Sequence, residues 1–231
     1  MKDTKGSVSR MIEEKRSRRS KSKKGYSVTS EQFKLIRAGI DFSSIDQKMQ
    51  VMVITSPESG TGKSTVASHL AVAYAQKGER TILIDADMRK PTLYKHFSKN
   101  VRIGLSNLLV GEFNLGESIQ KVKMDDCVLA ILTSGPTPPN PNDLLSSNRM
   151  SALIDTLKGS FDRIIIDTPP VTIVSDALIL ADLADGTVLV CRYQKTLKEK
   201  AKYAVNKLKL SKAKLIGVVF NGTKNIEEYY Y

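Results

Sequence analysis

The stretch Ser56-Pro57-Glu58-Ser59-Gly60-Thr61-Gly62-Lys63-Ser64-Thr65 decides the fold of this chain. It follows an apolar segment, residues 51–54, and precedes an alanine-rich segment with helical character, residues 66–75. A strand, a glycine-rich turn, Gly-Lys-Ser and a helix form the context that a phosphate-binding loop requires. The sequence therefore predicts such a loop, although Pro57 stands where the usual pattern has Gly or Ala.

The chemistry of the loop follows from its residue types. Glycines allow several backbone N–H groups to face one anion, and the helix N-terminus adds partial positive charge. Lys63 would bring a point charge to the outer phosphates of a nucleotide, and the Ser64 hydroxyl would be a ligand for Mg²⁺.

Composition and charge narrow the class of protein. The chain has 231 residues, 41% of them hydrophobic, which is enough for one α/β domain with tails. We expect no membrane span and no secretion signal, because no apolar run is long enough. Cys127 and Cys191 fall in apolar segments and are expected to be reduced core thiols, and the two histidines form no ligand cluster.

The net charge of +12 is unevenly distributed along the sequence. Residues 1–25 hold ten Lys and Arg against three acids, and we interpret residues 1–28 as a basic flexible arm. The arm is either a solvated tail or a segment that binds anionic lipid headgroups or an acidic partner. Nucleic acid is not expected, because no aromatic residues are interleaved with these charges.

The alternation of strands and helices predicts a doubly wound, mainly parallel α/β sheet with helices on both faces. A capping-box spacing at Thr29 and Gln32 predicts a first helix near residues 30–43. Expected strands are 51–55, 80–85, 127–132, 161–167, 186–192 and 214–220. Expected helices are 64–77, 146–158, 174–183 and 196–210, with shorter helices within 104–121 and a rigid proline-rich loop at 135–142.

Acidic residues end two of the predicted strands. Asp85 and Asp87 follow one apolar run, and Asp167 follows another. Ligands of open α/β sheets bind beyond the carboxyl ends of the strands, so these acids should meet the phosphate loop and a Mg²⁺ ion. Arg89 and Lys90 either neutralise phosphate charge or belong to a solvated turn.

Taken together, these motifs resemble the bacterial tyrosine kinases (BY-kinases) of capsule and exopolysaccharide synthesis, of the CapB/CpsD type, in the P-loop NTPase superfamily. Residues 56–65 look like the family's Walker A motif, 82–91 like its Walker A′ and 164–170 like its Walker B. The loop at 133–145 is also similar. Glu31, Lys34 and Arg37 resemble the family's ring-packing element E-x-x-R-x-x-R, with Lys in place of its first Arg. The chain ends in Tyr229-Tyr230-Tyr231, like the family's autophosphorylated cluster.

The resemblance implies transfer of the γ-phosphoryl group of ATP to tyrosine. The catalytic residues would be Lys63, Asp85 and Asp87, with Asp85 orienting or deprotonating the acceptor hydroxyl. Ser64 and Asp167, with Asp85 or Asp87, would hold Mg²⁺. Asn221 matches the adenine-binding position of the superfamily, although an Asn-Gly turn explains it equally well. The expected ATP-binding residues are Ser59, Gly60, Thr61, Gly62, Lys63, Ser64, Thr65 and Asn221.

Domain organisation and partners follow from the same resemblance. The kinase domain would span residues 29–223 and the tyrosine tail 224–231. The tail would enter a neighbouring active site in a ring of identical chains, and phosphorylation would disperse the ring. A separate membrane protein would activate the kinase through its cytoplasmic tail, so that the cytoplasmic chain is held at the membrane by its partner. Sugar-nucleotide enzymes are the implied external substrates.

Two other classes of protein compete with this interpretation. The first is an ATPase switch of the cell-division and partition type (MinD/ParA-like), which carries a lysine five positions before the Walker lysine. Glu58 occupies that position here and has the opposite charge. The second is an ATP-binding scaffold without catalysis, which does not require the full set of Lys63, Asp85, Asp87 and Asp167.

Overall fold

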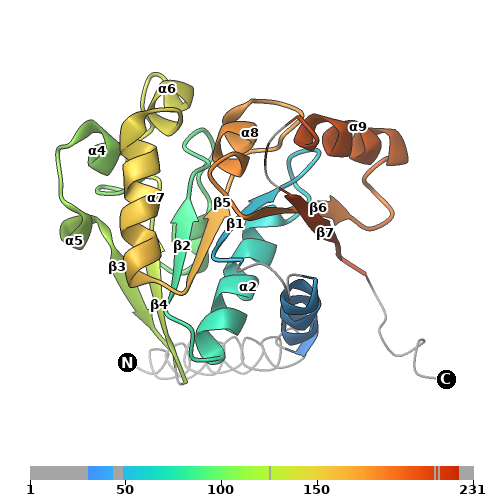
Figure 1. Cartoon of the computed structure of the whole chain (residues 1–231), viewed down its shortest axis with the longest axis horizontal. Coiled ribbons are helices and arrows are strands. Elements are labelled where there is room, and N and C mark those ends of the chain that lie inside the picture. The colour runs from blue at the N-terminus through green and yellow to red at the C-terminus, as the bar shows by residue number, and fades with distance from the viewer. Residues whose placement is uncertain (1–30, 44–48, 125, 211, 213, 224–231) are drawn as a thin grey trace, which may run out of the picture.

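The computed structural model describes residues 31–43, 49–124, 126–210, 212 and 214–223. Within them, one seven-stranded sheet runs in the order β3-β4-β2-β5-β1-β6-β7 (Figure 1). All neighbouring strands are parallel except β3 and β4, which are antiparallel. The strands are β1 (Val51–Thr55), β2 (Thr81–Asp85), β3 (Gln120–Lys123), β4 (Val128–Leu132), β5 (Arg163–Asp167), β6 (Gly186–Arg192) and β7 (Lys214–Asn221).

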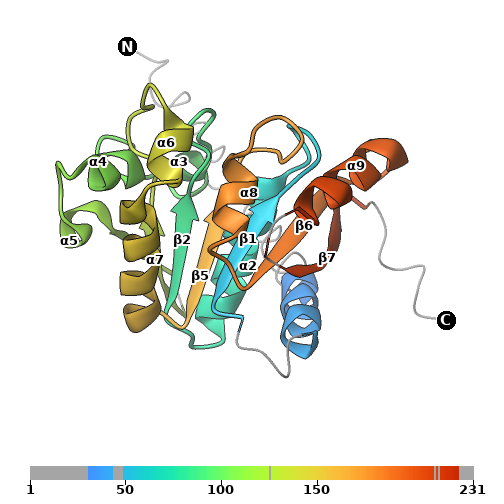
Figure 2. The same cartoon turned by 45° about the horizontal axis from the view of Figure 1, so that its top comes forward.

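Helices cover both faces of this sheet (Figures 1 and 2). A first helix spans residues 31–42. The others are α2 (Lys63–Gln76), α3 (Leu93–His96), α4 (Leu105–Val110), α5 (Leu115–Ser118), α6 (Pro141–Leu145), α7 (Asn148–Ser160), α8 (Asp176–Ala181) and α9 (Lys198–Leu208). The predicted doubly wound α/β class is confirmed.

The central strands are apolar along their length because both of their faces are buried. Successive side chains of a strand point to opposite faces. Met52 and Ile54 therefore join α2 and the first helix in one core, whereas Val51 and Val53 join α4, α7 and α8 in the other. A third, smaller cluster packs α9 through Ala204 and Leu208 against β6.

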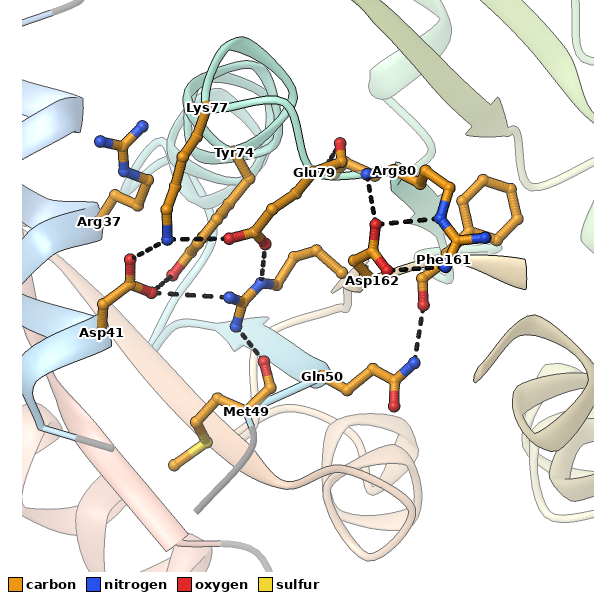
Figure 3. A network of polar contacts seen from close by, with 12 residues as sticks. Arg37, Asp41, Met49, Gln50, Tyr74, Lys77, Glu79, Arg80, Phe161 and Asp162 are labelled. Carbon is orange, nitrogen blue, oxygen red and sulfur yellow. Dashed lines mark hydrogen bonds and ion pairs between the residues drawn. The ribbon is translucent and has the colours of Figure 1, made fainter. Parts of the chain in front are cut away.

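A polar network attaches the first helix to the end of the sheet that lies away from the phosphate loop (Figure 3). At its centre, the guanidinium of Arg163 lies 4.0 Å from the ring centroid of Tyr74 and forms ion pairs with Glu79 and Asp41, at 3.0 Å and 3.6 Å. The Tyr74 hydroxyl donates to Asp41 at 3.1 Å, and Lys77 bridges Asp41 and Glu79. The network joins the first helix, α2 and β5 into one body.

Two local predictions need correction. Residues 120–123 form the antiparallel edge strand β3, although we expected short helices up to residue 121. The sequence Gln-Lys-Val-Lys is polar because only alternate side chains of this edge strand are half-buried. The predicted proline-rich loop also ends in helix α6, which starts at Pro141, where the missing N–H costs no helical bond.

Several predictions fall on residues outside the described part of the chain. These are the basic arm at 1–28, the capping box at Thr29 and the tyrosine tail at 224–231. Among the residues that are described, no helix is long and apolar enough to span a bilayer. Cys127 and Cys191 are free thiols, as expected, but Cys127 is only half-buried and lies just before β4.

Candidate active site

The phosphate-binding loop connects β1 to α2 at the carboxyl edge of the sheet (Figure 2). Gly60 and Gly62 have φ values of 80° and 87°, in the left-handed region that favours glycine. A Cβ atom on Gly62 would lie 1.9 Å from Nδ2 of Asn221. That amide instead donates to the carbonyl oxygen of Thr61 at 2.9 Å. The end of β7 therefore supports the phosphate loop, and only glycine fits at position 62, next to the Asn221 side chain.

Lys63 is the first residue of α2 and points toward the predicted carboxylates. Its Nζ lies 3.0 Å from Oδ2 of Asp87, 3.3 Å from Oδ1 of Asp167 and 3.3 Å from the Ser64 hydroxyl. Burial alone would lower the pKa of Lys63, but Asp167, Asp87 and Asp85 together outweigh it and raise that pKa. The ammonium group is therefore charged and compensated by carboxylates.

Asp85 lies behind this pair and is fully buried. Its carboxylate accepts hydrogen bonds from the backbone N–H groups of Asp87 and Leu93, both at 3.2 Å. In the parallel register of β2 and β5 it lies directly beside Asp167. Burial, then repulsion from Asp167, raises the pKa of Asp85 to about 8. The structure thus places Asp85 next to the cluster but behind the wall of the cleft.

Asp167 is the last residue of β5, and one of its carboxylate oxygens has no hydrogen-bond partner among the described residues. Burial raises the pKa of this carboxyl, against the attraction of Lys63 and a hydrogen bond from Ser64. Its Oδ2 is buried and has no hydrogen-bond partner among the described residues. An unpaired buried carboxylate oxygen is costly. Asp167 is therefore well suited to a cation that joins the site.

A cleft of about 390 Å³ opens in front of Lys63. The phosphate loop, the segment after β2 and the Pro169–Pro170 segment after β5 form its walls. Asp87, Arg89, Lys90 and His96 line it, so positive side chains outnumber acids at the surface that a polyphosphate would meet. Burial lowers the pKa of His96, which leaves Arg89 and Lys90 as the cations of this wall.

Arg89 has a partner that sequence reasoning missed. Its Nε and Nη2 lie 3.0 Å and 3.2 Å from the two carboxylate oxygens of Asp176, which is fully buried at the start of α8. Asn142 of α6 also donates to Asp176, at 3.2 Å. The sequence gives no sign of this partner, because an acid in the first turn of a helix is common for helix stability alone. Arg89 is thus held in a fixed position, while Lys90 faces the cleft without this clamp.

The residues of the predicted ring-packing element have partners within the chain. Lys34 pairs with Glu31 on the same helix at 2.7 Å, and Arg37 donates to the carbonyl oxygen of Ala73 at 2.7 Å. Glu31 and Lys34 remain exposed, whereas Arg37 is half-buried. Their role between chains stays a prediction. The three predicted acceptor tyrosines lie outside the described residues.

Comparisons with known proteins identify the family of this chain. A family profile described as an AAA domain matches residues 49–212. The tyrosine-protein kinase YwqD of Bacillus subtilis is 43% identical over 208 residues, covering 89% of this chain and 87% of that protein. The tyrosine-protein kinase CpsD of Streptococcus agalactiae is 38% identical over 194 residues, covering 84% and 83%.

Among solved structures, the chimerical protein CapA2B2 superposes with a TM-score of 0.80 at 40% identity, covering 84% of this chain and 85% of that one. The fold and the sequence identity therefore agree over most of the length of both chains. The chain belongs to the bacterial tyrosine-protein kinases, a branch of the P-loop NTPase-type α/β proteins.

Proposed function

We propose that this protein transfers the γ-phosphoryl group of ATP to tyrosine hydroxyls, first of all those of Tyr229, Tyr230 and Tyr231 on a neighbouring copy. The observation that carries the proposal is the position of Lys63 at an open cleft: its Nζ lies 3.0 Å from a carboxylate oxygen of Asp87 and 3.3 Å from one of Asp167. Phosphoryl transfer asks mainly for positioning and charge compensation, and this cluster offers both.

Each residue has a role that its surroundings support. The loop at 59–65 would hold the phosphates with backbone N–H groups, and Lys63 would contact the β- and γ-phosphates. Asp87 lines the cleft and is available to orient or deprotonate the incoming phenol. Asp85 lies behind the cleft wall, and its raised pKa suits a carboxyl that takes up a proton. Asn221 would contact the adenine only by giving up its bond to Thr61.

The residues present fit a Mg²⁺ ion that arrives with the nucleotide. Oδ2 of Asp167 has no hydrogen-bond partner among the described residues, and the Ser64 hydroxyl interacts with the same carboxyl group. The described residues hold no set of three or more His, Cys, Asp or Glu side chains that could bind a metal. Mg²⁺ usually takes one or two carboxylates and completes its shell with phosphate oxygens and water. Ser64, Asp167 and Asp87 or Asp85 would hold the ion, which would neutralise charge on the phosphates.

The ATPase switch is the alternative function, and one contact counts against it. Glu58, at the position of the switch family's second lysine, forms an ion pair with Lys200 of α9 at 2.6 Å. A carboxylate held in this way cannot bind the phosphates of a neighbouring chain. The kinase function is therefore the better supported of the two.

The family also supports a wider proposal about domains and partners. Residues 29–223 would form the kinase domain, between a basic arm at 1–28 and a tail at 224–231. Residues 222–231 could span at most about 33 Å, and we propose that they enter the cleft of an adjacent copy in a ring. The cytoplasmic tail of a membrane protein would activate the kinase and keep this cytoplasmic chain at the membrane. The kinase would act in capsule or exopolysaccharide synthesis, with sugar-nucleotide enzymes as its external substrates.

A complementation experiment tests the transfer and its direction. Lys63→Met removes the catalytic cation but keeps the tail, whereas a variant with Tyr229, Tyr230 and Tyr231 changed to Phe keeps the site but removes the acceptors. The two are mixed with Mg-ATP, with and without the activating tail, and phosphotyrosine is mapped by mass spectrometry.

Phosphotyrosine on the Lys63→Met chain of the mixture, and on neither variant alone, supports transfer between copies. ATP hydrolysis by the wild type without any phosphotyrosine would favour the switch. Neither reaction, in the presence of the activating tail, would favour the scaffold. Light scattering before and after ATP treatment tests the ring, because an unchanged particle size contradicts dispersal by phosphorylation.

A further inference from the structure

A second concentration of positive charge lies around α9, far from the basic arm in the sequence. Residues 192–214 contain nine lysines and arginines and one acid, a net charge of +8 compared with +12 for the whole chain. Outside the arm and this segment, the chain is net negative. The segment's basic residues are Arg192, Lys195, Lys198, Lys200, Lys202, Lys207, Lys209, Lys212 and Lys214.

Most of these lysines are solvent-exposed and uncompensated. Lys200 pairs with Glu58, and Lys207 donates to the carbonyl oxygen of Thr172. No ion pair with another described residue is present for Lys195, Lys198, Lys202, Lys209, Lys212 or Lys214. Like charges this close repel one another, so the arrangement favours a polyanionic partner.

The helix geometry directs this charge outward. Ala204 and Leu208 are buried against β6, and Figures 1 and 2 show α9 at the outer edge of the molecule. Lys198, Lys202 and Lys209 share one side of the helix and line a shallow groove of about 390 Å³ whose floor includes Ala201 and Val205. The exposed face is therefore a groove with an apolar floor and lysines along its rim.

Large apolar side chains lie beside the lysines. Tyr203 of α9 is 54% exposed, and Leu210, in the turn that follows the helix, is 81% exposed. Leu197, at the start of α9, is also exposed. Exposed apolar side chains with polar residues around them mark surfaces that contact a protein or a membrane when they form a patch.

We propose that the outer face of α9 (Lys198, Lys202 and Tyr203) and the turn that follows it (Lys209 and Leu210) bind the surface of a membrane that contains anionic phospholipids. Lysines on the polar side of an amphipathic helix bind lipid phosphates, and leucine and tyrosine enter the boundary between headgroups and acyl chains. A phosphodiester chain gives Leu210 nothing to contact. Sites that recognise nucleic acid phosphates also favour the fork of arginine, whereas all the basic residues of α9 are lysines.

This surface is connected to the active site. Lys200 contacts Glu58 of the phosphate loop, and Lys207 contacts Thr172, whose hydroxyl donates to the carbonyl oxygen of Pro57. A membrane at α9 would therefore lie on the side of the molecule where the phosphate loop begins. The contact differs from attachment by the basic arm or by a partner protein, and it does not depend on the kinase reaction.

Vesicle flotation of the full-length protein tests the proposal. The variant Lys198→Gln/Lys202→Gln/Lys209→Gln is compared with the control Lys95→Gln/Lys121→Gln/Lys123→Gln, in which three exposed lysines of α3 and the opposite edge strand are replaced. Both triple variants lose the same charge. Vesicles consist of phosphatidylcholine alone or mixed with phosphatidylglycerol. Because the arm could bind the same vesicles, each variant is also made with Arg16, Arg18 and Arg19 changed to Gln.

We expect the partition coefficient of the α9 variant on anionic vesicles to fall about 100-fold. Each lysine near an anionic surface contributes about 1 kcal/mol to binding, and the variant loses three. The control should lose far less, and neither should bind neutral vesicles strongly. Leu210→Asn should weaken the binding that remains at high salt. Circular dichroism and nucleotide binding report that the variants fold.

Equal losses for the α9 variant and the control would overturn the proposal, as would unchanged binding of the α9 variant in the background without the arm arginines. A single-stranded oligonucleotide is the competing ligand. If the α9 substitutions weaken oligonucleotide binding but leave vesicle binding unchanged, the surface binds nucleic acid and the lipid proposal is wrong.

Discussion

Lys63 and Asp87 form an ion pair at the floor of the cleft, with 3.0 Å between Nζ and Oδ2 and both side chains nearly buried. The lysine comes from the first turn of α2 and the acid from the segment after β2. A nucleotide's phosphates would compete with Asp87 for the ammonium group. The carboxylate that is released would then be free for the metal or the acceptor, so the pair holds both groups ready before substrate arrives.

Asp87→Asn tests this relationship. The amide keeps the shape of the side chain but removes its charge, so Lys63 becomes more available to phosphate. We expect Mg²⁺-dependent phosphorylation to fall by about 10²- to 10³-fold, while nucleotide affinity measured in EDTA stays equal or increases. Steady-state rates and calorimetric titrations measure the two quantities. Nucleotide affinity that falls in EDTA along with the rate would contradict this account of the pair.

The pH dependence of stability should depend on Asp85. Its pKa is raised to about 8 in the folded protein, from an ordinary value of 3.8, so folding takes up a proton between these values. The free energy of unfolding should therefore decrease as pH rises from about 4 to 8, by at most about 1.4 kcal/mol per pH unit. Asp85→Asn removes this titration. The variant should be less stable than the wild type at pH 5, and this difference should shrink or reverse by pH 9.

Urea denaturation in EDTA, without nucleotide, measures this effect across the pH range. The control is Asp155→Asn, which changes an exposed carboxylate on α7 whose side chain is 76% accessible. The control should follow the wild type at every pH. If Asp85→Asn also follows the wild type at every pH, the carboxyl does not take up a proton on folding.

Gly62→Ala and Gly60→Ala separate backbone strain from a clash. Both glycines have positive φ, so alanine at either position should cost about 1 kcal/mol. Only at Gly62 does the new Cβ meet the amide of Asn221, and no atom lies within 4 Å at Gly60. Gly62→Ala should therefore also break the bond from Asn221 to Thr61, which adds about 1 kcal/mol and weakens nucleotide binding.

A double-mutant cycle with Asn221→Ala measures the clash. In that background, thermal unfolding should show similar costs for Gly62→Ala and Gly60→Ala. A cost of Gly62→Ala that is the same with and without the Asn221 side chain would mean that the two residues do not interact.

Arg163→Met should destabilise the attachment of the first helix shown in Figure 3. The guanidinium is nearly buried, so its loss removes the ion pairs with Glu79 and Asp41, the contact with the Tyr74 ring and the hydrogen bond to the carbonyl oxygen of Met49. We expect a loss of about 3 kcal/mol in the free energy of unfolding. Tyr74→Phe removes only the bond to Asp41 and should cost about 1 kcal/mol.

Arg80→Met is the matched control, because Arg80 forms a similar ion pair with Asp162 but is exposed. Surface pairs of this kind contribute little to stability. Chemical denaturation of the three variants measures the differences. If Arg80→Met destabilises as much as Arg163→Met, burial of the network is not the source of its strength.

The parts of the site that were predictable come from contiguous sequence. The phosphate loop comes from ten consecutive residues, 56–65, which follow β1 and run into the first turn of α2, so the glycines and the helix start act locally. Asp85 and Asp167 could be placed together because parallel strands end at the same edge of a sheet. Lys63 lies near Asp87 and Asp167 for the same reasons, because the loop places the lysine at the edge of the sheet where these strands end.

The missed contacts join residues far apart in the chain. Arg89 and Asp176 are 87 positions apart, Glu58 and Lys200 are 142 apart, and Asn221 and Thr61 are 160 apart. The position of Asp85 behind the cleft wall was also not visible, since a period-two pattern gives the side of a strand but not the depth of burial. The edge strand β3 has too few apolar residues to be recognised.

The sequence by itself determined the order of the six parallel strands and of the long helices between them, the phosphate loop and the three acids, because each depends on local backbone preference and on the apolar pattern of neighbouring residues. Only the tertiary structure decided which charges are paired: it buried Asp85 fully, clamped Arg89 with Asp176 and left most lysines of α9 exposed. Charge pairing depends on which side chains of distant segments share a space that excludes water, and that space exists only when the sheet and its helices have packed.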